Sequence, residues 1–142
     1  MKYTELLGPN GEKPAWWVWK NFTPKEVSCK CCGEIWRDED GSDPNNPPDW
    51  FVANMDSIQE LRNRLGKPLS ITCGHRCRKH NAEVGGVSNS QHYTHIAYDC
   101  VCPRAQQNSF SVLATASGFK FILPYPSRNF VHVDRRVGKP GY

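Results

Sequence analysis

The sequence has no long apolar run and no strong excess of either charge. Among its 142 residues, no window approaches the ~18 consecutive apolar positions of a membrane-spanning helix. Residues 1–20 also lack the apolar core followed by small residues that marks a secretory leader. The net charge of +4 is too small to indicate a nucleic-acid-binding protein. We therefore expect a protein made in the cytoplasm that neither inserts into a membrane nor binds nucleic acid, and we expect it to be a monomer.

Cysteine, in contrast, is abundant. The seven cysteines fall into three groups, which are Cys29, Cys31 and Cys32, then Cys73 and Cys77, then Cys100 and Cys102. They do not form the paired C-x-x-C motifs of a zinc ribbon, and thiols stay reduced by default in a protein without a secretory leader. We expect small buried side chains or a few late disulfides, with a second, structural metal site as the alternative.

Helical and strand patterns are mixed along the chain. Asp49 and Gly66 bound a segment with apolar residues at helical spacing, which predicts a helix over 49–65. Further helices are expected over 78–84 and 103–117, and strands over 68–72, 96–101, 119–123 and 129–134. A proline-rich turn between the last two strands predicts an antiparallel hairpin. The pattern indicates an α+β fold with a small antiparallel sheet, flanking helices and long loops.

Residues 1–142 are expected to form a single domain, because their number suits one hydrophobic core. Residues 1–20 are an aromatic-rich extension that carries Trp16, Trp17 and Trp19. We expect these tryptophans to cover the core instead of forming a platform for sugars.

The stretch SQHYTHIAYDC, residues 90–100, holds two histidines and an aspartate within eight positions. We expect a loop that carries His92 and leads into a strand that carries Asp99. Along the last predicted strand, Phe130, His132 and Asp134 share one face because side chains alternate. If the two strands are neighbours, Asp99 and His132 can meet, with His92 closing the site from the loop. Two imidazoles and one carboxylate form a catalytic zinc set that leaves a fourth position for water.

Three ordered blocks carry a family resemblance. SQHYTHIAYD resembles the Ser-x-His-x6-Asp motif of the zinc D-alanyl-D-alanine peptidases, which are grouped with lysostaphin-type peptidases and hedgehog. ITCGHRCRKHNAEVGGVSNSQH is similar to the preceding block of that family, and YPSRNFVHVDRR to its ending. NFTPKEVSCKCCG resembles the N-terminal segment of small cell-wall peptidases of this type. The resemblance covers residues 21–136 and implies a zinc peptidase domain with a hedgehog-like fold.

The resemblance implies a role for several residues. The zinc ligands, for one Zn2+ per chain, are His92, Asp99 and His132. Arg76 faces the substrate carboxylate or the developing oxyanion, and Ser90 binds the substrate backbone. His95, in the same segment, is a further candidate for binding substrate.

The general base is left open by departures from the family. Asp134 matches the acid after the last ligand, which is either the base or a partner that orients this ligand. Where relatives hold a carboxylate, this chain has Asn129, which cannot accept a proton. His75 and His95 replace the family's usual Tyr and Gly, and either could act as the base instead. A mechanism without a protein base remains the third possibility.

The resemblance implies a zinc metallopeptidase that hydrolyses peptide bonds in the stem or cross-link of peptidoglycan, as an endolysin-like endopeptidase. The basic cluster HRCRKH, residues 75–80, suits an anionic polymer. The enzyme would act on the cell wall during phage or prophage release, or after export by another route. The alternatives are a D-alanyl-D-alanine carboxypeptidase, a non-catalytic zinc-binding module of the same fold, and a structural zinc protein built on the cysteines.

Overall fold

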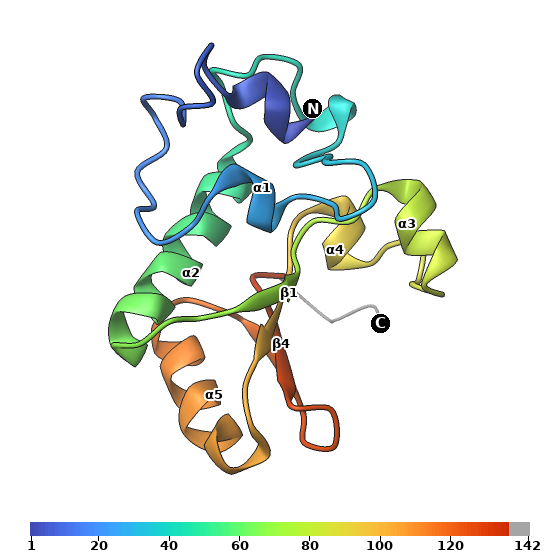
Figure 1. Cartoon of the computed structure of the whole chain (residues 1–142). Helices are drawn as coiled ribbons and strands as arrows, with labels where there is room; N and C mark the ends of the chain where they lie inside the picture. Colours follow the sequence, from blue (N-terminus) through green and yellow to red (C-terminus); the bar gives the residue numbers. More distant parts are fainter. Residues whose placement is uncertain (137–142) are drawn as a thin grey trace.

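The computed structural model describes residues 1–136, which form a four-stranded antiparallel sheet flanked by helices (Figure 1). The strands are β1 (Ile71–Cys73), β2 (Tyr98–Val101), β3 (Phe121–Tyr125) and β4 (Phe130–Asp134), in the spatial order β1-β2-β4-β3. The α-helices are α1 (Pro24–Val27), α2 (Asp49–Leu65), α3 (Arg78–Glu83), α4 (Gln91–Thr94) and α5 (Gln107–Ala116). Short 3-10 turns cover Tyr3–Leu6, Asp38–Asp40 and Arg104–Gln106. This architecture confirms the predicted α+β fold with a small antiparallel sheet.

The sheet has one face toward the core and one face away from it. On β2, Tyr98 and Cys100 are fully buried, and on β4 Val131 and Val133 are fully buried. Their neighbours along each strand point to the opposite face, because side chains alternate along a strand. This opposite face carries Asp99 on β2 and His132 on β4, and it therefore presents polar groups as well as apolar ones.

Helices α2 and α5 pack against each other beside the core face of the sheet (Figure 1). Helix α2 buries one apolar stripe at spacings of three and four residues, made of Phe51, Met55, Ile58 and Leu61. It ends at Gly66, whose left-handed φ of 66° only glycine adopts at little cost. None of the helices in residues 1–136 is long and apolar enough to cross a membrane.

The N-terminal tryptophans belong to the core. Trp17 and Trp19 are 7% and 3% exposed and meet edge to face with ring centroids 4.9 Å apart. The indole N–H of Trp17 donates to the carbonyl oxygen of Phe22 at 2.9 Å, and that of Trp19 donates to Asp56 at 2.8 Å. Because both buried indoles are satisfied inside the protein, the prediction that this segment covers the core is confirmed.

Several predicted boundaries were wrong by a few residues. Strand β1 begins at Ile71 instead of Pro68, which has no N–H to donate to a neighbouring strand. The helix expected from Pro103 begins as a 3-10 turn, and α5 itself starts at Gln107. The larger correction concerns His92, which lies on the single-turn helix α4 and not on a loop. Ser90 explains the turn, because its hydroxyl accepts from the backbone N–H of His92 at 3.3 Å and caps the helix.

Candidate active site

Strand pairing brings the predicted carboxylate to one predicted imidazole. Asp99 on β2 lies directly opposite His132 on β4, and both side chains leave the sheet on the face away from the core. Oδ1 of Asp99 is 3.1 Å from Nδ1 of His132. The strand adjacency that the sequence left conditional is therefore present in the structure.

Helix α4 brings the second imidazole to the same carboxylate oxygen. His92 is 3% exposed, and its Nε2 lies 3.3 Å from Oδ1 of Asp99. The backbone N–H of Arg76 donates to the carbonyl oxygen of His92 at 2.7 Å and ties α4 to the segment after β1. Three elements distant in sequence thus place His92, Asp99 and His132 around one point.

The protonation of His92 makes this arrangement favour a cation. Nδ1 of His92 is 2.7 Å from the carbonyl oxygen of Gly74, which can only accept, so Nδ1 carries a proton. Burial lowers the pKa of His92 below its usual value, so the ring is neutral at pH 7 and Nε2 holds a lone pair. This lone pair faces the oxygen of Asp99, and two acceptors at this distance repel each other unless a cation lies between them.

His132 is fixed by the acid that follows it on the strand. Its Nε2 donates to Oδ2 of the fully buried Asp134 at 2.7 Å, which turns Nδ1 toward Asp99. Arg136 also donates to Asp134, with Nη2 2.6 Å from Oδ2. Burial raises the pKa of Asp134, but hydrogen bonds from His132 and Arg136 outweigh burial and hold the pKa at about 2. Asp134 is thus an ionised carboxylate that orients a candidate metal ligand.

Asp99 remains ionised for a similar reason. Burial raises the pKa of its carboxyl group, but the hydrogen bond from His132 is the largest opposing contribution, and the pKa lies below its usual range. For His132, burial lowers the pKa, and the contacts with Asp134 and Asp99 outweigh it and raise the pKa. A metal ion at this point would therefore compete with a proton for Nδ1 of His132.

Arg76 and Ser90 lie together beside these three residues. Nη2 of Arg76 donates to the hydroxyl oxygen of Ser90 at 3.2 Å. Nε of Arg76 is buried and has no hydrogen-bond partner within residues 1–136. A buried guanidinium N–H without an acceptor is costly, and a substrate oxygen would satisfy it. Both residues thus occupy positions that suit the roles implied by the resemblance.

An open cleft of about 440 Å³ connects these groups. Its floor includes the three candidate ligands together with Arg76 and Ser90. One wall is the β3–β4 hairpin, which contributes the apolar side chains Phe121, Leu123, Tyr125 and Phe130. Two more arginines, Arg128 and Arg136, lie over aromatic rings of this wall, with Cζ of Arg136 4.0 Å from the ring centroid of Phe121. The cleft can bind an extended chain that carries negative charge.

The other candidate residues are not part of this cleft. His95 lies outside its lining, with Nδ1 2.9 Å from the hydroxyl oxygen of Thr94 and its ring against Trp50. His75 is 1% exposed, and both its ring nitrogens are engaged, by Glu34 and by the carbonyl oxygen of His95. Asn129 lies in the β3–β4 turn, where its side chain accepts from the backbone of Arg104 at 3.4 Å. None of these three side chains reaches the candidate ligands.

Sequence reasoning missed the two wall arginines and Cys73. Both arginines lie within the family-like ending YPSRNFVHVDRR, and the paired arginines after Asp134 were the available signal. Cys73 lies close enough to His92 and Asp99 to be a further metal-binding candidate. Its sulfur is 3.5 Å from Nδ1 of His92, the ring nitrogen that bonds to Gly74 and not the one that faces Asp99.

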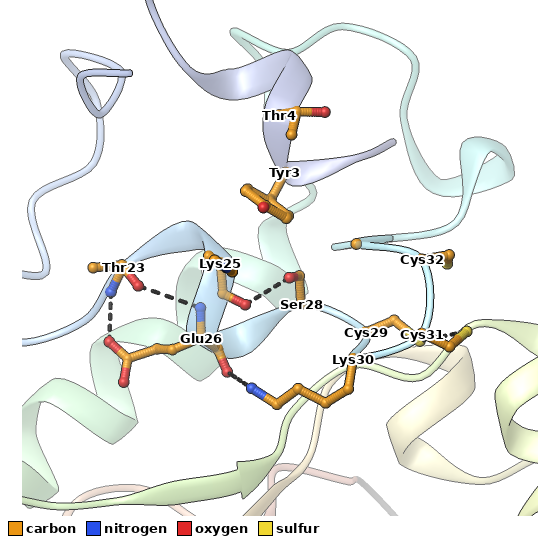
Figure 2. A pocket seen from close by; sticks show the side chains of 11 residues that line it. Tyr3, Thr4, Thr23, Lys25, Glu26, Ser28, Cys29, Lys30, Cys31 and Cys32 are labelled. Atoms are coloured by element: carbon orange, nitrogen blue, oxygen red, sulfur yellow. Dashed lines mark hydrogen bonds between the residues drawn. The ribbon is translucent and has the colours of Figure 1, made fainter. Parts of the chain in front are cut away.

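A larger cavity elsewhere is lined by Cys29, Cys31 and Cys32 and has no imidazole among the described residues that line it. It measures about 540 Å³ and lies between α1, the first 3-10 turn and the loop after α1 (Figure 2). The carboxylate of Glu26 in its lining accepts from the backbone N–H of Thr23 at 2.6 Å and closes the cap of α1. We therefore assign the active site to the smaller cleft.

The two imidazoles and one carboxylate are the donor types of a catalytic zinc site, and two of the ligand-to-ligand separations fit zinc as well. The ligand atoms that all lie within 4.8 Å of one another are those of Cys73, His92 and Asp99, and His132 joins them through its contact with Asp99. Zinc with nitrogen and oxygen ligands at about 2.0–2.1 Å has ligand-to-ligand edges of about 3.3–3.4 Å in a tetrahedron. The distances from Oδ1 of Asp99 to the two imidazole nitrogens, 3.3 and 3.1 Å, are close to such edges. Three protein ligands at an open cleft also leave room for a water molecule, as in catalytic zinc sites.

Comparison with known proteins agrees with this geometry. The sequence matches the peptidase M15 family over residues 20–134, which is most of the chain and includes all three candidate ligands. The comparison with curated proteins found no match. The chain belongs to the peptidase M15 family, which is similar to the zinc D-Ala-D-Ala carboxypeptidases.

Proposed function

We propose that the chain is a zinc-dependent peptidase that cleaves peptide bonds in the stem or cross-link of peptidoglycan, in the manner of an endolysin. The observation that carries the proposal is the neutral imidazole of His92, whose lone pair faces the ionised carboxylate of Asp99 in an open cleft. A cation between these two groups turns a repulsive contact into two metal bonds. The site of action in this proposal is the bacterial cell wall.

Zinc bound at this point would polarise a carbonyl group and lower the pKa of a water molecule. The residues of the chain do the remaining work. His92, Asp99 and His132 hold the metal, and Asp134 keeps Nδ1 of His132 turned toward it. Arg76 stabilises negative charge on the substrate through its unpartnered Nε, and the hydroxyl of Ser90 holds the guanidinium in place.

The position of Asp134 supports an orienting role more than a role as general base. Its Oδ2 accepts hydrogen bonds from the side chains of His132 and Arg136, and its Oδ1 accepts one from the backbone N–H of Arg136 at 2.9 Å. The side chain is fully buried, and it contacts the imidazole nitrogen that points away from Asp99. Among the described residues that line the cleft, Asp99 itself is the only carboxylate.

The peptide of peptidoglycan suits this cleft in two respects. It carries free carboxylates, which the cleft arginines Arg76 and Arg128 can neutralise. It is also extended, and the hairpin wall offers an apolar surface along its length.

The unpartnered Nε of Arg76 also favours a second candidate, a D-alanyl-D-alanine carboxypeptidase. A guanidinium binds a terminal carboxylate through two parallel hydrogen bonds, and a chain end would place this group next to the scissile bond. In an endopeptidase the same N–H groups would face a carbonyl oxygen instead.

Digestion of purified peptidoglycan distinguishes these candidates. The zinc-loaded protein should convert cross-linked muropeptides into shorter peptides with new amino groups, as seen by mass spectrometry, and His132→Ala should not. Release of terminal D-alanine alone would assign the carboxypeptidase. If the zinc-loaded protein produces neither change, the proposed substrate is wrong.

A further inference from the structure

Four cysteines form a second cluster that shares no residue with the cleft ligands. Cys29, Cys31 and Cys32 lie on the loop after α1, and Cys77 lies at the start of α3. Their four sulfur atoms all lie within 4.8 Å of one another. Cys31 is central, with its sulfur 3.5 Å from that of Cys29 and 3.3 Å from that of Cys77. Figure 2 shows the three loop cysteines, with the contact between Cys29 and Cys31 dashed.

We propose that these four cysteines bind a structural zinc ion. Zinc with four thiolate ligands at about 2.3 Å has sulfur-to-sulfur edges of about 3.8 Å in a tetrahedron. The observed separations of 3.3–3.5 Å, and the 4.8 Å limit for the whole set, bracket this value. Cys29 and Cys32 stand in a single C-x-x-C motif, and the second pair that a zinc ribbon would supply is replaced by Cys31 and Cys77.

The backbone around the cluster donates hydrogen bonds to sulfur. The N–H of His80 lies 3.3 Å from the sulfur of Cys77. The backbone N–H of Glu34 and the ammonium group of Lys2 donate to the sulfur of Cys32. Donors aimed at sulfur stabilise the thiolate, which is the form that binds a metal.

His80 provides a further partner next to the cluster. Its Nδ1 is 3.3 Å from the sulfur of Cys29. An imidazole N–H that donates to a ligating sulfur supports the ligand without occupying a position on the metal. A zinc ion with four thiolates carries a double negative charge, and the positive charge of Lys2 beside Cys32 partly offsets it.

A tight turn presents the three loop cysteines on one side. The N–H of Gly33 donates to the carbonyl oxygen of Cys29 at 2.8 Å. Gly33 has a φ of 80°, and a Cβ at this position would come within 3.0 Å of the ring of Tyr3. Glycine is thus required here on two counts, and the turn returns the chain toward Cys32 and Cys77.

Disulfide bonds would engage fewer of these four sulfur atoms than one metal ion would. Three of the four cysteines lie within four consecutive residues, where a bond between neighbours is strained. Cys77 can pair with one of them, which leaves two thiols unused beside the bond. One zinc ion engages all four sulfur atoms at once.

The proposed zinc links distant parts of the chain next to a functional residue. Cys31 and Cys77 are 46 residues apart in sequence. Cys77 directly follows Arg76, so a metal bound to it anchors the backbone that presents this guanidinium to the cleft. The ion therefore has a positioning role for the active site in addition to joining the N-terminal segment to α3.

The test measures metal content and cobalt spectra on full-length protein purified under reducing conditions. The wild-type chain should hold about two zinc ions, one per site, and Cys77→Ser should lose one of them. The matched control Cys102→Ser, a buried cysteine outside the cluster, should keep both. Reconstitution of His132→Ala with Co²⁺ should give the intense near-ultraviolet band of thiolate-to-cobalt charge transfer, because its cysteine site is intact.

Each outcome bears on the two metal sites separately. If the cleft binds no zinc, the wild type holds one ion and His132→Ala keeps it, which leaves the cysteine site standing and defeats the proposed function. If His132→Ala holds no zinc and gives no charge-transfer band, the cysteine site is wrong. An intact mass lower by two hydrogens, with Cys77 in a disulfide, would also overturn it. The cobalt experiment needs no cysteine variant to fold.

Discussion

The two clusters of metal-binding side chains differ in ligand number and in surroundings. The cleft cluster has three candidate ligands, His92, Asp99 and His132, carried by α4 and two strands, and it opens into a cavity of about 440 Å³. The cysteine cluster has four sulfur atoms within 4.8 Å of one another, carried by a loop and the start of α3. Three ligands at an open cleft leave a position for chemistry, whereas four ligands fill a tetrahedron. The same metal can therefore be catalytic at one site and structural at the other.

The donor atoms sharpen this difference. Thiolates are soft ligands that hold zinc strongly, while the cleft offers imidazole and carboxylate groups that also bind protons in the working range of pH. Each cleft imidazole donates a second hydrogen bond, His92 to the carbonyl oxygen of Gly74 and His132 to the carboxylate of Asp134. We expect a chelator to remove the cleft metal first and to leave the folded cysteine site intact.

The largest expected effect comes from removing a cleft ligand. His132→Ala should reduce peptidase activity to background, because the metal loses one of three protein ligands. The fold should persist, since β4 keeps its buried Val131 and Val133. Activity on peptidoglycan, zinc content and far-ultraviolet circular dichroism are the measurements. Wild-type turnover by a variant that lacks the cleft zinc would contradict the catalytic role of this site.

Arg76→Lys should have the next largest effect. Lysine keeps the positive charge but loses the planar fork and the Nε that has no partner in the described structure. We expect kcat/KM to fall by about 10²–10³-fold, as for loss of an oxyanion donor, with both zinc ions retained. Arg78→Lys is the matched control, because Arg78 is exposed two residues away. Equal kinetics of the two variants would remove Arg76 from the active site.

Asp134→Asn tests whether this acid orients His132 or acts as the general base. With a pKa of about 2 the native carboxylate is ionised at every practical assay pH, so substitution is the way to remove its charge. An orienting role predicts that zinc affinity of the cleft falls by about 10–100-fold and that saturating zinc restores much of the activity. Competition with a chromogenic chelator measures the affinity. A loss of several orders in kcat at unchanged affinity would identify Asp134 as the base.

The elements with strong periodicity were the ones that sequence could predict. Helix α2 matches its predicted range because four apolar residues recur on one face and Gly66 ends it. The β3–β4 hairpin was expected from two apolar segments around a turn. The single-turn helix α4 was missed, because contacts from other elements decide so short a segment: Ser90 caps it, and His92 is buried against Gly74.

The candidate site also has a part that the sequence could predict and a part that it could not. The family motif named His92, Asp99 and His132 as candidate ligands, and the structure brings the two imidazoles to the carboxylate of Asp99. The cysteine cluster depends on a contact between residues 46 positions apart, which neither periodicity nor the single C-x-x-C motif specifies. The orientation of Asp134 toward His132 required side-chain geometry that strand alternation only made possible.

The smallest expected effect is that of His95→Gln. This variant tests whether His95 binds substrate in the cleft or only packs beside it. The sequence marked His95 as a substrate-binding candidate, but the structure places its ring against Trp50, with centroids 5.2 Å apart, outside the cleft lining. Burial lowers its pKa, so the ring is neutral at pH 7 and its loss removes no charge from the site.

We therefore expect kcat/KM of His95→Gln to stay within about twofold of the wild type. The unfolding free energy should fall by about 1 kcal/mol, because the packing of the ring against Trp50 is lost. Steady-state kinetics and denaturant unfolding measure the two quantities on the same preparation. A large loss of kcat/KM with unchanged stability would mean that His95 reaches the substrate, and the cleft would then extend beyond its present wall.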